Sequence, residues 1–248
     1  MVGVFVLVSV SKLTQAAPRW ARKPLSAYQK SCLRKHSRYF QKLLPGQQRD
    51  FERRVAQFIA SKTFIPRNFE EVTDEMKVLI AAAAVQLTFG LQRVGMKHFQ
   101  YIVVYPKEYY SPDGENFHKG EVNPKRKAIV LSWRYFVESM AKDDGRNLGL
   151  HEMAHALELE NMIRNGEQDF FDRDVLQKWS WEVAREIRRM REGAASFFRD
   201  YAATNHHEFF ASAVEVFFEQ PASLYDYNRR LYGLLCVLLN QNPLLMNR

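Results

Sequence analysis

The sequence predicts an α+β fold that is mostly helical, with a small mixed sheet beside one buried helix. Apolar residues recur at helical spacing in the N-terminal third and again after residue 160. Short β-branched and aromatic runs lie between residues 101 and 133, and an apolar run with helical character follows at residues 148–157. The chain of 248 residues is 46% hydrophobic and 26% charged, which is ordinary globular usage and suffices for a sizeable core.

The chain is expected to divide near residue 24. Residues 1–24 are an apolar N-terminal segment followed by a basic linker, and residues 25–248 are expected to form a single domain. The run Met1–Val10 is nearly all apolar, but it is too short to span a bilayer and lacks the basic flank of a signal peptide. It is the remainder of a longer anchor, a short anchor-like tail or a buried strand, so membrane association through the N-terminus stays open.

Cysteine usage and net charge limit the expected cellular location and the expected binding partners. Cys32 and Cys236 are the only cysteines and lack the spacing of a disulfide framework, which favours a cytoplasmic location, with anchoring by the N-terminal segment as the alternative. The net charge is +8. No nucleic-acid motif accompanies the early cations, so we interpret them as a solvated basic face and expect no nucleic-acid partner. These cations are Arg19, Arg22, Lys23, Lys30, Arg34, Lys35, Arg38 and Lys42.

Helices are expected in the N-terminal third. Residues 25–44 mix apolar and basic residues at helical spacing and end at Pro45-Gly46. Residues 47–62 follow as an amphipathic helix, and residues 63–72 form a loop or a short strand. Thr73 is a suitable N-cap for a helix through residues 76–91, which is apolar nearly all round and therefore belongs in the core.

The strand signals lie in the middle of the chain. Tyr101–Tyr105 is β-branched and aromatic and stops at a proline; Glu121–Val122 and Ala128–Trp133 are further candidates, joined by a turn at residues 123–126. An earlier turn is indicated by Pro112-Asp113-Gly114. These strands precede a loop at residues 143–147, in which Asn147 is suited to cap the next helix.

The remainder of the chain is expected to be helical. Residues 172–191 form an amphipathic helix, and a connecting segment follows at residues 194–201. Residues 207–220 form a second, apolar helix, and residues 224–240 close the domain as a third.

The chemistry centres on His-Glu-x-x-His within the apolar run. His151 and His155 are four residues apart, so on a helix they share one face with Cβ atoms about 5–6 Å apart and can converge on one ion. Burying these groups without partners is costly, and a divalent metal removes that cost. We therefore expect one Zn²⁺ per chain, with Glu152 placed to take a proton from water.

A catalytic zinc site needs a third protein ligand, and the residues alone leave four candidates open. Glu208 and Glu215 lie seven residues apart on one face of a predicted apolar helix, so one of them can bind metal while the other supports the site. His206 and His207 are adjacent to them in sequence.

Three blocks of sequence carry a family resemblance. The first is Val72–Met76 with the alanine-rich helix after it and Val104-Tyr105-Pro106; the second joins residues 129–133 to Asn147–Glu158; the third runs from Tyr201 through Glu219. With these blocks the chain resembles the Mlc titration factor A (MtfA) family of zinc peptidases, over roughly Phe51–Pro243. The resemblance implies a zincin-like metallopeptidase core, related in fold to the catalytic domain of anthrax lethal factor.

The resemblance assigns roles to individual residues. It implies that His151, His155 and Glu208 are the metal ligands, that Glu152 is the catalytic base and that Tyr201 stabilises the transition state. Glu215 then becomes a residue that supports the site without binding the ion.

Two departures from the family pattern bear on specificity. Glu158 stands where the family commonly has aspartate, and the segment between Glu158 and Tyr201 looks shorter than in enterobacterial members. Neither position is a ligand, so these departures affect the expected substrate and partners rather than the expected metal site.

The function implied is zinc-dependent hydrolysis of a peptide or protein substrate, aminopeptidase-like and regulatory. The strand before the metal helix is expected to pair with extended substrate, which makes Ser132 and Trp133 candidate substrate-binding residues. The alternative is a protein-binding regulator that sequesters a transcriptional repressor and has weak peptidase activity.

Overall fold

The computed structural model describes residues 23–91, 94–111 and 116–246. The run Met1–Val10 and the turn expected at Pro112-Asp113-Gly114 lie outside these residues. Among the helices of the described part, none is both long enough and apolar enough to cross a membrane.

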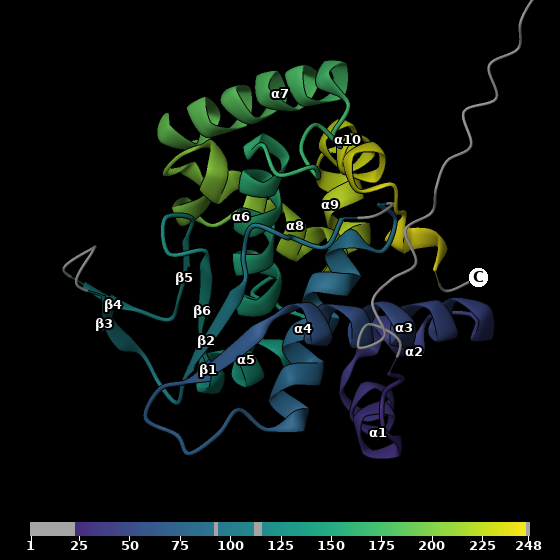
Figure 1. Ribbon diagram of the computed structural model, residues 1–248. Helices are drawn as coiled ribbons and strands as arrows, with labels where there is room; N and C mark the ends of the chain where they lie inside the picture. Colours follow the sequence, from purple (N-terminus) through teal and green to yellow (C-terminus); the bar gives the residue numbers. More distant parts are fainter. Residues whose placement is uncertain (1–22, 92–93, 112–115, 247–248) are drawn as a thin grey trace, which may run out of the picture.

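Helices dominate the structure (Figure 1), which confirms the predicted mostly helical α+β class. The α-helices are α1 (Ala27–His36), α2 (Arg38–Gln41), α3 (Pro45–Ser61), α4 (Asp74–Thr88), α5 (Trp133–Met140), α6 (Leu148–Met162), α7 (Arg173–Arg191), α8 (His206–Glu219), α9 (Pro221–Tyr227) and α10 (Arg229–Leu239). The described residues also form the short 3-10 helices η2 (Asp200–Ala203) and η3 (Pro243–Leu245).

The sheet is small and mixed, as predicted. Its strands are β1 (Thr63–Pro66), β2 (Tyr101–Tyr105), β5 (Gly120–Asn123) and β6 (Ala128–Ser132), in the order β1-β2-β6-β5. β1, β2 and β6 are parallel, whereas β5 runs antiparallel to β6. β6 therefore has a partner on each side, and β5 forms an edge of the sheet. A separate hairpin that the sequence did not predict pairs β3 (Tyr109–Ser111) with β4 (Asn116–His118).

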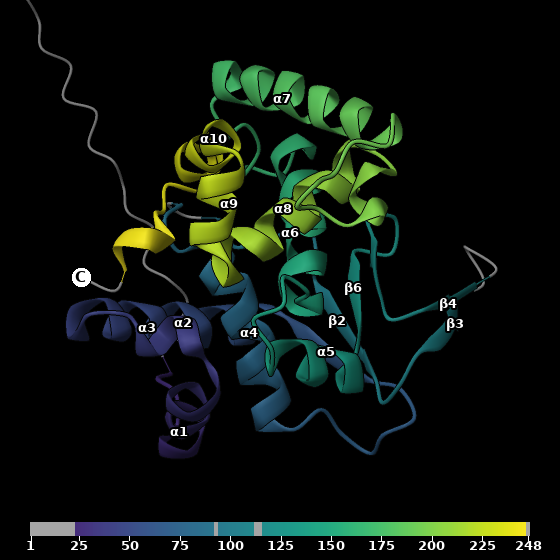
Figure 2. The same cartoon turned by 180° about the vertical axis from the view of Figure 1, so that it is seen from behind.

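One face of the sheet packs on helices. Ile102, Val104, Ile129 and Leu131 are fully buried, as expected for alternate residues that share a face. Figures 1 and 2 show α4 and α6 on one side of the sheet, where α6 contacts both β5 and β6. This packing sets α6 directly beside the edge strand.

The two central helices begin where their cap residues predict. Thr73 accepts a hydrogen bond from the Met76 backbone N–H at the start of α4, and Asn147 accepts one from Leu150 N–H at the start of α6. Gly149 allows α6 to approach α5, because a Cβ atom there would lie 2.5 Å from Cε2 of Phe136. Along its length α6 also packs against α8.

Several predicted elements were wrong in extent. The helix expected over residues 25–44 is divided at Ser37, which caps α2, and the helix expected over residues 224–240 is divided at Asn228, which caps α10. The strand expected to reach Trp133 ends at Ser132, because Trp133 is the first residue of α5. The helix α5 itself was not predicted.

Candidate metal centre

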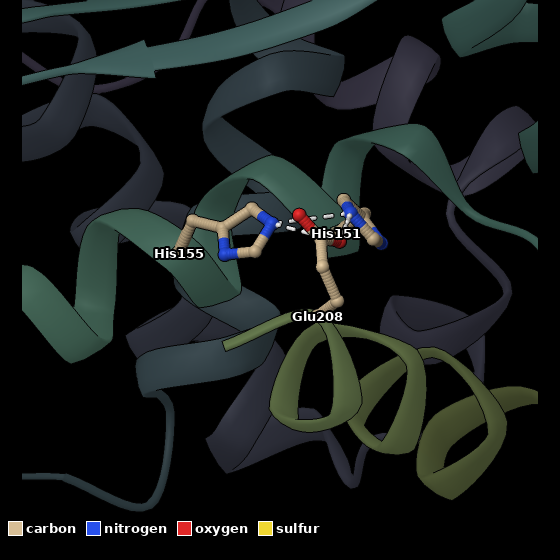
Figure 3. A group of neighbouring side chains, drawn as sticks. All are labelled: His151, His155 and Glu208. Atoms are coloured by element: carbon tan, nitrogen blue, oxygen red, sulfur yellow. Dashed lines mark hydrogen bonds and ion pairs between the residues drawn. The ribbon is translucent and has the colours of Figure 1, made fainter. Parts of the chain in front are cut away.

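α6 and α8 bring three potential metal ligands together (Figure 3). One ligand atom from each of His151, His155 and Glu208 lies within 4.8 Å of the others. Glu208 Oε2 is 3.2 Å from His151 Nε2 and 3.5 Å from His155 Nε2, and the two Nε2 atoms are 3.2 Å apart. The three side chains therefore point toward one small volume between the helices.

The donor set suits a zinc ion. Two imidazole nitrogens and one carboxylate oxygen are ligands that Zn²⁺ prefers, and three protein ligands leave one position open, as in catalytic sites. Glu208 Oε2 is buried and has no hydrogen-bond partner of ordinary geometry among the described residues. A cation coordinated by this oxygen would satisfy it, so the residues present fit the metal that the sequence suggests.

The electrostatics of the group favour positive charge. Burial by itself lowers the pKa of His151, but the neighbouring carboxylates of Glu208 and Glu215 outweigh it and raise that pKa to about 10. Burial opposes ionisation of Glu208, yet the adjacent His151 and His155 hold its pKa well below the usual range. Without an ion, the His151 imidazole therefore carries a proton at neutral pH, and a divalent metal would replace this positive charge.

Glu215 orients His151 from the side opposite Glu208. Its Oε1 lies 2.8 Å from His151 Nδ1, and the carboxylate is buried. Glu215 also accepts hydrogen bonds from the Asn147 backbone N–H and, at 3.1 Å, from Arg199 Nη2. A carboxylate held in this way fixes the ring plane and the tautomer of the histidine, leaving Nε2 for the ion.

Glu152 is buried at the wall between α6 and β5. Burial raises its pKa to about 7, although the neighbouring His151 and His155 oppose this shift. Its side chain packs against Gly120 of β5, where a Cβ atom would lie 2.3 Å from Glu152 Oε1. Sequence reasoning did not single out Gly120, although a glycine within a strand signals close approach of another group.

Tyr201 comes from η2, the turn that leads into α8. It is 54% exposed, and its ring centroid is 6.3 Å from that of His151. Partial burial, and then the charge of Glu208, raise its pKa to about 12, so the phenol keeps its proton at neutral pH. Tyr201 can therefore donate a hydrogen bond into the space beside the histidines.

Two cavities meet at this centre. One of about 430 Å³ opens toward Glu158 and Asn205, and another of about 560 Å³ opens toward α5 and the loop before α6. Both are lined by the same central residues, which are His118, Gly120, His151, Glu152 and Tyr201. The two cavities thus form a groove that passes over the candidate catalytic residues and along β5.

Ser132 and Trp133, which the sequence suggested as substrate-binding residues, do not line either cavity and have other partners in the structure. Ser132 is fully buried, and its backbone N–H donates to Lys119 O at 2.8 Å. β6 is occupied on both edges, so it has no free edge to offer, and Trp133 stacks on Phe136 in α5. The edge strand beside the groove is β5.

The two neighbouring histidines do not join the metal cluster. His206 is exposed at the start of α8. His207 Nδ1 lies 2.7 Å from Oε2 of Glu158, which places this pair on the rim of the smaller cavity. The geometry thus separates Glu208 from the other three candidates for the third ligand.

Comparison with known proteins identifies relatives that cover most of the chain. It is 28% identical over 230 residues to an uncharacterized protein of Synechocystis, covering 86% of this chain and 84% of the relative. It is 26% identical over 219 residues to Mlc titration factor A of Klebsiella pneumoniae, covering 82% of each chain, and 27% identical over 224 residues to that of Cronobacter sakazakii, again covering 82% of each.

A family profile matches an even larger part of the sequence. The family is described as glucose-regulated metallo-peptidase M90, and the match extends over residues 11–238. It agrees with the resemblance to Mlc titration factor A that the three sequence blocks indicated, and with the cluster of potential ligands between α6 and α8. The chain therefore belongs to the glucose-regulated metallo-peptidase M90 family, and its function is of the metallopeptidase type.

Proposed function

We propose that this protein is a zinc-dependent peptidase that hydrolyses peptide bonds of an extended substrate, with aminopeptidase-like cleavage and a regulatory role. One observation carries the proposal: Glu152 and the ligand atoms of His151, His155 and Glu208 line one cavity beside the free edge of β5. A general base, a metal site and a peptide-binding edge are the three parts that such a reaction requires.

The same residues that form the cluster would bind the ion. His151, His155 and Glu208 would hold it, and Glu215 would keep His151 oriented through Nδ1. A zinc ion bound there supplies Lewis acidity toward water and toward the scissile carbonyl. Because the ligands come from two packed helices, their positions are set by the protein before any metal arrives.

In the proposed reaction Glu152 transfers a proton and Tyr201 donates a hydrogen bond. Glu152 would take a proton from the attacking water and pass it to the nitrogen of the leaving amine, because its carboxylate lines the same cavity as the three ligands. Tyr201 donates its O–H to the oxygen on which negative charge develops in the transition state. Both roles fall to residues that line the same groove.

The substrate backbone has a defined place. β5 is the last strand in the order of the sheet, so its outer edge can add one more strand. Main-chain hydrogen bonds along this edge hold a peptide in an extended form over Glu152, which packs against Gly120. The sequence suggested this pairing with substrate for β6, the neighbouring strand. We assign it to β5, because β5 has no partner on its outer edge among the described strands.

Metal analysis and a cleavage assay test the proposal. We expect about one zinc per chain, and cleavage of short unblocked peptides that stops when a chelator is added. Glu152→Gln should keep zinc and fold while losing about 10²–10⁴-fold in turnover, because glutamine is nearly isosteric but cannot act as a base. Cleavage by the variant at the wild-type rate would contradict the role of Glu152.

A second candidate function is regulatory protein binding, and the name of the relatives favours it. They are called Mlc titration factor A, a name that refers to titration of another protein. In this alternative the chain sequesters a transcriptional repressor, and the peptidase site is weak. Glu152→Gln separates the two functions, because binding of a repressor would survive the substitution whereas hydrolysis would not.

A further inference from the structure

The two ends of the groove differ in charge. We call the cavity toward Glu158 the acidic end and the cavity toward α5 the basic end. Glu121 and Glu158 line the acidic end together with the metal cluster, Glu158 paired with His207 at 2.7 Å, and no lysine or arginine among the described residues lines it. Four cations line the basic end, namely Lys119, Lys142, Arg146 and Arg199.

The carboxylates at the basic end are largely engaged elsewhere. Glu138 pairs with Arg134 at 2.8 Å, and Glu215 pairs with His151 and Arg199. Glu152 is buried beside β5. The fourth, Asp144, accepts a hydrogen bond from the Arg146 backbone N–H at 3.1 Å through Oδ1.

Three of the cations are available to a ligand. Within the part of the chain that the structure describes, Lys119, Lys142 and Arg146 form no ion pair. Lys119 Nζ lies over the ring of Tyr135, 4.4 Å from its centroid, and Lys142 is exposed. Three cations that line one end of a groove, with one carboxylate beside them, form a site for negative charge.

The edge strand gives the groove a direction. Lys119 lines the basic end, Gly120 lies at the centre, and Glu121 and Val122 line the acidic end, so the chain passes from basic to acidic as it enters β5. A substrate strand antiparallel to β5 runs the other way, with its amino-terminal side at the acidic end and its carboxyl-terminal side at the basic end. Antiparallel pairing is the more stable arrangement and the commoner one.

The charge of a peptide agrees with this direction. A carboxylate suits the end lined by the three cations, whereas the end with Glu121 and Glu158 has no lysine or arginine among its described lining residues. A parallel substrate would place its carboxylate at the end with the two glutamates. The general preference for antiparallel pairing and the distribution of lysines and arginines are independent arguments, and they select the same orientation.

We infer that Lys119, Lys142 and Arg146 bind negative charge on the carboxyl side of the scissile bond. The preferred substrates are peptides with an acidic side chain or a free terminal carboxylate at those positions. This inference rests on the proposed function, because it assigns the substrate class of that site. Exposed ion pairs change an equilibrium or rate constant by about 2–5-fold each, so three of them should give a preference of about 10-fold.

Peptides that differ at one position test the inference. We would measure kcat/KM of the zinc-loaded wild type for a set that carries Asp, Ala or Lys after the scissile bond, and Kd of the same set on zinc-loaded Glu152→Gln. We expect Asp to exceed Lys by about 10-fold in both measurements, with a smaller difference at high salt because screening weakens exposed charge pairs.

Two double variants with the same change in net charge show which residues cause the preference for acidic peptides. Lys142→Glu/Arg146→Glu should abolish or reverse the preference while zinc content stays unchanged. Arg173→Glu/Lys178→Glu on the exposed side of α7 makes the same change in net charge away from the groove, and it should keep the preference. Loss of the preference in both double variants would mean that total charge, not the basic end, causes it, and would overturn the inference.

The binding arm keeps this test separate from that of the proposed function. Equal Kd values for the Asp and Lys peptides would overturn the inference even if both are cleaved. A preference for acidic residues before the scissile bond would overturn the assigned direction. Absence of cleavage by the zinc-loaded wild type, with the binding preference intact, would contradict the proposed peptidase function but not the charge selectivity of the groove.

Discussion

Oε1 of Glu215 lies 2.8 Å from Nδ1 of His151. Glu215 is on α8, seven residues beyond Glu208. The two glutamates thus approach one imidazole from opposite sides, Glu208 at Nε2 and Glu215 at Nδ1. Only the Nε2 side faces His155, so the two carboxylates have different tasks in any metal complex that forms there.

The first prediction separates these two glutamates. Glu208→Ala should abolish tight zinc binding, because it removes one of three ligands and opens the site to water. Glu215→Ala should weaken zinc binding by about 10–100-fold, the usual effect of losing a partner that orients a ligand. Zinc titration of both variants measures the difference. If Glu215→Ala loses the metal while Glu208→Ala keeps it, the ligand has been assigned to the wrong residue.

The second prediction concerns Gly120. A methyl group at this position would meet the Glu152 carboxylate at 2.3 Å, and the end of that flexible side chain must then move. We therefore expect Gly120→Ala to lower kcat by at least about 10-fold, with little change in thermal stability or zinc content. Gly46→Ala serves as a control, because a Cβ atom there meets only the end of the Arg49 side chain at 3.9 Å. Full activity in Gly120→Ala would show that the position of Glu152 tolerates displacement.

The third prediction concerns Tyr201. Tyr201→Phe removes one hydroxyl from a half-exposed side chain, so the fold and the zinc content should be unchanged. If the hydroxyl contacts the oxyanion only in the transition state, kcat should fall by roughly 10²-fold while KM stays nearly constant. Steady-state kinetics with one peptide over a range of concentrations measures both constants. A rise in KM with unchanged kcat would instead make Tyr201 a residue that binds the ground state.

The fourth prediction is a pH dependence of stability that arises from Glu219. Its carboxylate accepts hydrogen bonds from Gly145 N–H and Asn147 Nδ2, both at 2.9 Å, and burial raises its pKa from 4.5 to about 7. Between pH 4.5 and pH 7 the folded state therefore keeps a proton on Glu219 that the unfolded state has already lost. The stabilising contribution of that proton is complete below pH 4.5 and is lost as the pH rises through 7.

A glutamine at position 219 cannot titrate, so the Glu219→Gln variant should not lose stability in this way as the pH rises. Denaturant unfolding at pH 5 and pH 8 should show that the stability of the wild type relative to Glu219→Gln falls by about 1–2 kcal/mol at the higher pH. Glu71→Gln, a change at an exposed side chain, should follow the wild type. Equal pH dependence in wild type and Glu219→Gln would mean that Glu219 does not carry the proton.

Local signals in the sequence predicted the elements that their own residues determine. Thr73 and Asn147 begin α4 and α6 as their cap chemistry indicates. The helix breaks at Ser37 and Asn228 were not predicted, because apolar spacing continues on both sides and nothing local distinguishes a polar residue within a helix from a new cap. Helix α5 was missed for a related reason: it follows a strand-like run with no turn residue between them.

The candidate site likewise combines features that local sequence determines with features that depend on the packing of distant segments. His151 and His155 are four residues apart, so their geometry follows from the helix alone. Family position, rather than chemistry, singled out Glu208 from its neighbours. The contact of Glu152 with Gly120, and the presence of Lys119 and Arg146 in the lining of one cavity, depend on how distant segments pack, and no local pattern reports that packing.

The stripe of carboxylates on α8 has a consequence for how the site forms. Glu208, Glu215 and Glu219 face α6 over a stretch of twelve residues, about 16 Å of helix at 1.5 Å rise per residue. They contact the histidines of α6, the backbone of Asn147 and the Asn147 side chain. Sliding α8 by one turn would break all three contacts at once, so the protein itself sets the register of the two helices. A chelator should then strip the ion and leave a folded, prearranged apoprotein, unlike small zinc domains that unravel without their metal.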